Sequence, residues 1–96
     1  MENTLKHKMN DDFTVVSNQI FRAGLSAKAV GLYACIAEVL TTGGRISASV
    51  LADMNKDGIA SVESGLRELE AAGWLRRSKK KDSKGHFYSV YELKNN

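Results

Sequence analysis

The stretch that decides the fold is Ser47–Leu75, which reads SASVLADMNKDGIASVESGLRELEAAGWL. Ser47 is a favourable N-cap, because its hydroxyl can accept a hydrogen bond from a free amide of the first helical turn. The spacing after it predicts a short helix over about 48–54 whose buried side chains are Val50, Leu51 and Met54. The polar run Asn55–Gly58 then breaks the pattern and predicts a tight turn.

A second helix is expected directly after this turn, over about 59–72. Asp57 is positioned to cap its first turn, and Gly73 suits the left-handed backbone that often follows a helix. Its apolar face is formed by Val62, Leu66 and Leu69. The stretch therefore predicts two helices joined by a short turn.

A longer helix is predicted upstream, over about 27–41, with Ser26 as its N-cap. Its apolar stripe recurs at intervals of three and four residues and consists of Ala29, Leu32, Tyr33, Ile36 and Leu40. Residues 18–21 are expected to form one helical turn that inserts Ile20 and Phe21 into the core. Residues 13–16 form a strand or an extended segment, and residues 1–12 are expected to be a flexible arm.

Downstream of Gly73 the hydrophobic period changes to two, which predicts strands. Residues 74–80 and 87–93 are expected to pair as a hairpin, with a type I turn over Asp82–Gly85 and Arg45–Ile46 as a short additional bridge. Trp74 and Tyr91 are assigned to the core, and the role of Tyr88 stays open between packing and base stacking. The expected fold class is mainly α with a small β-hairpin, as one domain over 13–94.

Positive charge is concentrated in the expected hairpin. The chain carries a net charge of +3, yet its segment 74–86 holds six basic residues against one acidic residue. The six are Arg76, Arg77, Lys79, Lys80, Lys81 and Lys84. A local basic patch of this kind is typical of a surface that contacts nucleic-acid phosphates. Lysines that protect an edge strand from aggregation are the alternative interpretation.

Other function classes find little support in the composition. One cysteine, Cys35, and two histidines, His7 and His86, do not suggest a disulfide or a structural zinc site, so we expect no metal and no cofactor. No apolar run is long enough to span a membrane, no signal peptide is apparent, and the expected compartment is the cytoplasm. No nucleophile or acid–base motif stands out, so we expect the protein not to be an enzyme.

The order helix, helix, helix, basic hairpin resembles the winged helix-turn-helix domains of bacterial, phage and plasmid transcription regulators and replication or partition proteins. The resemblance is carried by Leu51-Ala52, the glycine in the turn, Val62 and the ending Leu66…Leu69-Glu70…Gly73-Trp74-Leu75. The helix start Leu25–Ala29 adds to it, and together with the hairpin it covers most of residues 13–93. It implies a three-helix core with a C-terminal β wing that binds DNA.

This resemblance implies a sequence-selective double-stranded DNA-binding protein that acts as a transcriptional regulator. Helix 59–72 would read the major groove through Ser61, Ser64 and Arg67, and segment 74–93 would contact phosphates or the minor groove. Lys56 and the six basic residues above would neutralise phosphates. The expected recognition helix departs from those of common winged-helix domains, because it carries three acidic residues, Glu63, Glu68 and Glu70, and one arginine. Base discrimination is therefore expected to be modest.

Two further hypotheses stay open. The first is a plasmid or phage replication or partition protein that recognises origin or centromere-like repeats. The second is a protein-interaction adaptor on the same scaffold, which the acidic helix 59–72 favours. A homodimer on a two-fold DNA site is compatible with a domain this small, and the sequence leaves the dimer surface open.

Overall fold

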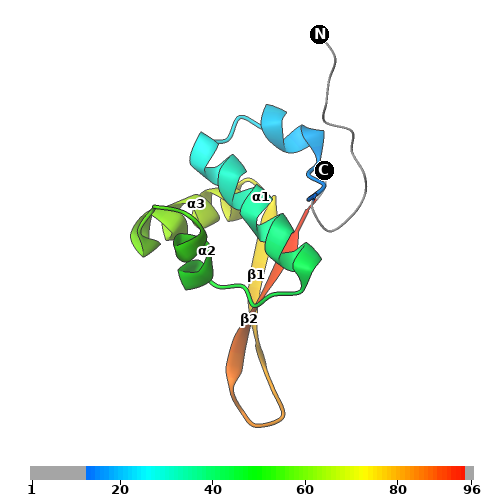
Figure 1. Cartoon of the computed structure of the whole chain (residues 1–96), viewed down its shortest axis with the longest axis vertical. Helices are drawn as coiled ribbons and strands as arrows, with labels where there is room; N and C mark the ends of the chain where they lie inside the picture. Colours follow the sequence, from blue (N-terminus) through cyan, green and yellow to red (C-terminus); the bar gives the residue numbers. More distant parts are fainter. Residues whose placement is uncertain (1–12, 95–96) are drawn as a thin grey trace.

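Three α-helices precede an antiparallel hairpin in the computed structural model of the protein, which describes residues 13–94 (Figure 1). The elements in chain order are the 3₁₀ helix η1 (Asn18–Arg22), α1 (Ala27–Thr42), α2 (Ala48–Met54), α3 (Ile59–Ala71), β1 (Leu75–Lys81) and β2 (Phe87–Leu93). This arrangement confirms the predicted fold class, a mainly α protein with a small β-hairpin in the winged-helix layout. The expected flexible arm, 1–12, lies outside the described residues.

The helix boundaries follow the predicted caps with one exception. The hydroxyl of Ser26 accepts from the Ala29 amide at 3.1 Å, and that of Ser47 accepts from the Val50 amide at 3.1 Å. The prediction that Asp57 caps α3 is wrong, because the N-cap is Gly58 and no side chain caps this helix. At its other end, Gly73 has a φ of 81°, and the Trp74 amide donates to the Leu69 carbonyl at 2.9 Å. This left-handed closure turns the chain directly into β1.

The hairpin closes through the predicted turn. Strands β1 and β2 pair antiparallel from Leu75 opposite Leu93 to Lys81 opposite Phe87. The Gly85 amide donates to the Asp82 carbonyl at 3.1 Å, and Gly85 takes the positive φ that glycine tolerates best. Within residues 13–94 the sheet has these two strands alone, so the predicted bridge at Arg45–Ile46 is wrong. Residues 13–16 form the extended segment rather than a strand.

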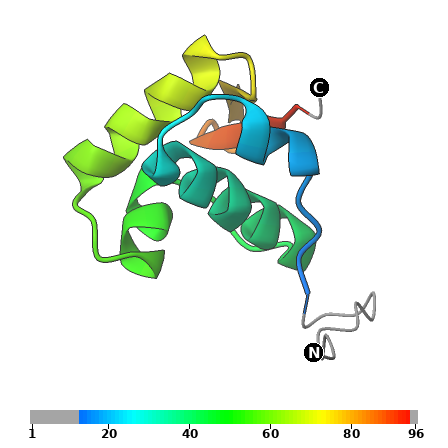
Figure 2. The same cartoon turned by 90° about the horizontal axis from the view of Figure 1, so that it is seen from above.

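The core lies where α1, α3 and the base of the hairpin meet. Figure 2 shows the hairpin between α3 and α1 when the molecule is viewed from above. The Tyr33 and Trp74 rings meet edge-to-face at a centroid distance of 5.8 Å. The fully or nearly fully buried side chains include Ile20, Leu32, Tyr33, Ile36, Leu51, Val62, Leu66, Leu69, Trp74 and Tyr91. The assignment of Trp74 and Tyr91 to the core is therefore confirmed.

Three predicted core residues are exposed instead. Phe21 is 62% exposed, because successive residues of a 3₁₀ helix point about 120° apart and Ile20 already faces the core. Leu40 and Met54 lie in the last turns of their helices and are 43% and 42% exposed. The apolar stripe predicted from the helical period runs to the end of each helix. The neighbouring elements do not extend that far, so they leave the last apolar side chains uncovered. Val39, which the predicted stripe did not contain, is buried in place of Leu40.

A matched pair of glycines tests the close approach of α1 and α3. A Cβ at Gly65 would collide with Leu32 Cδ1, which is buried, and would lie 3.3 Å from Lys28 Cγ. Gly31 has the same helical backbone and open space around it. We expect Gly31→Ala to raise the free energy of unfolding by about 1 kcal/mol through helix propensity. Gly65→Ala is expected to lower it, since overpacking costs about 1–3 kcal/mol.

Urea unfolding followed by circular dichroism measures both effects. Equal stabilisation by the two substitutions would contradict the close helix contact at Gly65.

Candidate nucleic-acid interface

The exposed face of the hairpin carries most of the predicted basic residues. Arg76, Lys79, Lys80, Lys81 and Lys84 are all exposed, and we call these five the basic cluster. Figure 1 shows that the distal part of the hairpin projects well beyond the three helices. Lys80, Lys81 and Lys84 therefore lie toward the projecting end of the hairpin, whereas Arg76 lies at its base beside the buried Leu75.

The cluster presents charge on both faces of the hairpin. Side chains of successive strand residues point to opposite faces, so Lys79 and Lys81 share one face of β1 while Arg76 and Lys80 share the other. Lys84 lies in the turn between the strands. Such a two-sided distribution suits a narrow element that inserts between phosphates, because cations then face both walls.

Few carboxylates compete for these cations. Asp82 is the acidic residue of the turn, and its Oδ1 accepts from the amides of Lys84 and His86 at 2.9 and 2.8 Å. Its Oδ2 lies 3.7 Å from Nδ1 of His86. Across residues 13–94, no carboxylate lies within 4.0 Å of a side-chain nitrogen of the basic cluster. Except at Arg76, which lies opposite Glu92 in the strand register, the positive potential of the cluster is thus left for an external anion.

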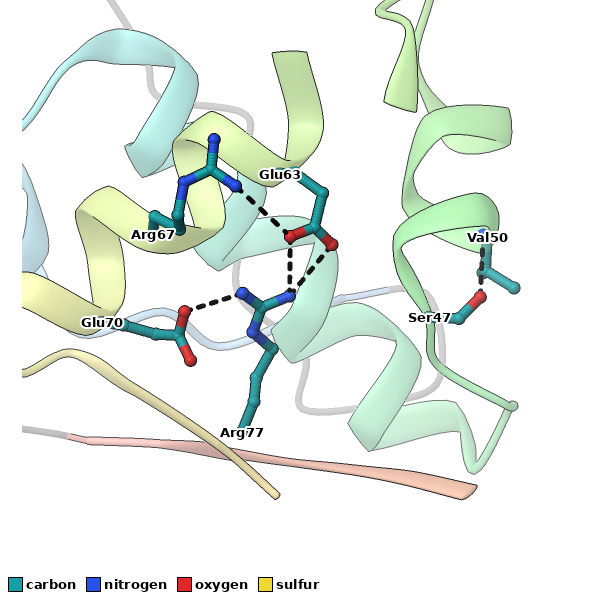
Figure 3. Close-up of polar contacts among 6 residues, drawn as sticks. All are labelled: Ser47, Val50, Glu63, Arg67, Glu70 and Arg77. Carbon is teal, nitrogen blue, oxygen red and sulfur yellow. Dashed lines mark hydrogen bonds and ion pairs between the residues drawn. The ribbon is translucent and has the colours of Figure 1, made fainter. Parts of the chain in front are cut away.

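Arg77 differs from the other basic residues of the hairpin. Its Nη1 donates to both carboxylate oxygens of Glu63 at 3.1 and 3.3 Å, and its Nη2 donates to Glu70 at 2.7 Å (Figure 3). The guanidinium also lies 5.9 Å from the centroid of the Tyr91 ring, and the side chain is 21% exposed. These contacts fasten β1 to α3, and for this reason Arg77 is not counted in the basic cluster.

The charges of Arg77 and Glu70 stabilise each other. The hydrogen bond from Arg77 lowers the pKa of Glu70, and the bond to Glu70 raises the pKa of Arg77 above its usual value. Both groups are therefore charged at neutral pH. The sequence contained a sign of this arrangement, because Glu63 and Glu70 are seven residues apart and share a helix face. Which strand residue they bind was not readable from spacing.

Glu68 also has an internal role. Its carboxylate accepts from the Ser26 amide at 2.7 Å and from the Ser26 hydroxyl at 2.6 Å, so it joins α3 to the start of α1. These hydrogen bonds lower the pKa of Glu68. All three glutamates of α3 therefore bind groups within the protein. The acidic composition of this helix favoured a protein-interaction adaptor. Its carboxylates are engaged in internal contacts and do not form an acidic outer surface.

The outer face of α3 carries little charge. Ser64 and Arg67 are exposed, and Arg67 lies 3.9 Å from Glu63. Ser61 is half-buried, because a rotation of about 100° per residue places it on the flank of α3 that carries Gly65 and Glu68. Ser64 is three residues from both Ser61 and Arg67, so the three side chains follow one another along α3, and Ser61 is the most covered of them. Lys56 is exposed in the turn before α3.

One basic residue outside the predicted set lies near the hairpin. Arg45 is exposed in the loop between α1 and α2, and this loop crosses the hairpin in Figure 1. Arg45 lines an open groove together with Lys79 and Phe87. Sequence reasoning missed it because Arg45 and Lys79 are far apart in the chain and meet only through the fold.

The fold and the exposed cations define a mainly α protein of winged-helix-like layout with a basic hairpin. No known family model matches the chain, and a comparison with curated proteins finds no relative. Within residues 13–94, no helix has both the length and the apolar character needed to cross a bilayer.

Proposed function

We propose that the protein binds double-stranded DNA with modest sequence selectivity and acts as a transcriptional regulator. The observation that supports this most directly is the basic cluster, which is exposed on a projecting hairpin with no carboxylate partner among residues 13–94. An α-helix fits the major groove, and a basic hairpin beside it reaches phosphates or the minor groove. In the proposed complex α3 enters the major groove and the hairpin contacts the backbone.

The two surfaces contribute different parts of the binding free energy. Ser64 and Arg67 would contact base edges, with Ser61 limited by its half-buried position. Serine specifies bases weakly, so most of the affinity is assigned to the basic cluster and Lys56. A homodimer on a two-fold site would double both sets of contacts and is part of the proposal.

The test is a titration with salt of binding to a random duplex of about 30 base pairs. Each phosphate that the protein neutralises releases counterions, so log affinity falls with log salt by about 0.9 per phosphate. With all five residues of the cluster and Lys56 engaged, we expect a steep linear slope of about 5. Fluorescence anisotropy with a labelled duplex measures the slope directly.

The outcomes separate this proposal from its competitors. A shallow slope, or no binding at low salt, would count against DNA as the partner and favour the protein-interaction adaptor. Cooperative binding to tandem repeats, with weak binding to a single site, would instead favour a plasmid or phage replication or partition role.

A further inference from the structure

The distal half of the hairpin exposes two aromatic side chains. Phe87 is 69% exposed and Tyr88 is 49% exposed, whereas Trp74 and Tyr91 at the hairpin base are buried. A large aromatic side chain that stays exposed on a protruding strand does not gain the free energy of burying its apolar area. The lysines beside it make the position unsuited to an apolar partner. The structure therefore separates the aromatics into a packing pair and an exposed pair.

Phe87 lies beside two lysines of the opposite strand. It lies opposite Lys81 in the strand register, and the Lys81 Nζ is 5.4 Å from its ring centroid. Lys79 and Ser89, paired with each other, lie on the same face of the hairpin. Cross-strand packing on Lys81 leaves more than two thirds of the Phe87 side chain open. Hairpin stability alone therefore does not account for this ring.

The face that carries Phe87 borders a groove. Its opposite wall is the loop between α1 and α2, which contributes Arg45 and Ile46, and its hairpin wall includes Lys79, Phe87 and Ser89. The groove thus combines cations from two elements with an open aromatic ring and a hydroxyl, and the carboxylate in its lining, Asp82, accepts from the Lys84 and His86 amides. Cations that follow a backbone, with aromatic rings on which bases stack, are the physical requirements of single-strand binding.

We propose that this groove binds a single strand of DNA adjoining the duplex, with one unpaired base stacked on Phe87. Arg45 and Lys79 would contact the phosphates on either side of that base. A base within a duplex is already stacked on its neighbours, so the open ring gains a contact only where a strand is unpaired. The inference rests on the proposed role of the hairpin in DNA binding, and it extends the ligand from a duplex to a duplex–single-strand junction.

The experiment compares a blunt duplex of about 20 base pairs with the same duplex carrying an overhang of about 6 nucleotides at either end. The proteins are the full chain, Phe87→Leu and Phe21→Leu. Leucine at 87 keeps apolar packing on Lys81 and removes the ring, while Phe21 is a comparably exposed phenylalanine outside the groove. We expect the full chain and Phe21→Leu to prefer an overhang by about tenfold. Phe87→Leu is expected to lose that preference.

The readout is the ratio of the two affinities, which cancels any general weakening of the hairpin. Equal affinity of the full chain for blunt and overhang duplexes would overturn the inference, as would a preference that survives in Phe87→Leu. A 2-aminopurine in the overhang supplies a second readout, because stacking on the ring quenches its fluorescence. If the full chain does not bind the blunt duplex, the result would count against the proposed function instead.

Discussion

Reversal of Lys79, Lys80 and Lys81 to glutamate is expected to abolish duplex binding without unfolding the protein. The three side chains are exposed and make no ion pair within residues 13–94, so their replacement breaks no salt bridge of the fold. Each lost phosphate contact lowers the salt slope by about 0.9, and the new carboxylates repel phosphates. We expect a loss of at least about a hundredfold in affinity at ~0.1 M salt, measured by fluorescence anisotropy.

The control is Arg22→Glu with Lys94→Glu. Arg22 ends η1 and Lys94 follows the last residue of β2, at the opposite end of the strand from the hairpin turn. Both are exposed, and their reversal changes the net charge in the same direction. We expect this variant to lose much less affinity, because close phosphate contacts outweigh the net charge at a distance beyond the Debye length of about 10 Å. Similar losses in both variants would assign binding to overall charge and contradict a hairpin interface.

Truncation of Leu66 to alanine is expected to have the largest effect on stability. Leu66 is fully buried in α3 within the main hydrophobic cluster. Removal of a buried leucine side chain loses its transfer free energy and leaves a cavity, which together cost about 2–5 kcal/mol. For a domain of this size we expect the melting temperature to fall by about 10 °C or more. Thermal and urea denaturation measure the change.

Leu40→Ala is the matched control for this substitution. Leu40 belongs to the apolar stripe of α1 by spacing, yet it is 43% exposed. We expect its truncation to cost less than about 1 kcal/mol, since little apolar area is removed from contact. A loss as large as that of Leu66→Ala would place Leu40 in the core and disagree with the structure.

The ion pairs of Arg77 with Glu63 and Glu70 link the two proposed DNA-contacting surfaces. Glu63 and Glu70 are on α3, and Arg77 is on β1, so their hydrogen bonds fix the base of the hairpin relative to the helix. An arginine fork that binds two carboxylates restrains orientation as well as distance. This anchoring holds the hairpin base against α3, which matters because two surfaces that bind one duplex must keep a defined spacing.

The candidate site was predictable where it depends on local patterns. The basic cluster was visible as a run of charges, and the Asp82–Gly85 turn was visible from its residue types, since both are properties of neighbouring residues. The ion pairs of Arg77 could not be predicted, because its carboxylate partners lie on another element. Charge alone does not distinguish a cation that binds a glutamate from one that faces solvent.

Local signals in the sequence were enough to predict the elements, their order and most of their limits, because caps, helical period and strand alternation act over a few residues. Packing between elements decided which ends of those elements are covered, as the exposure of Phe21 and Leu40 shows. It also decided the partners of the glutamates of α3, and it brought Arg45 to the groove beside Phe87. The physical reason is that burial and ion pairing depend on distances between segments remote in the chain, which no local pattern encodes.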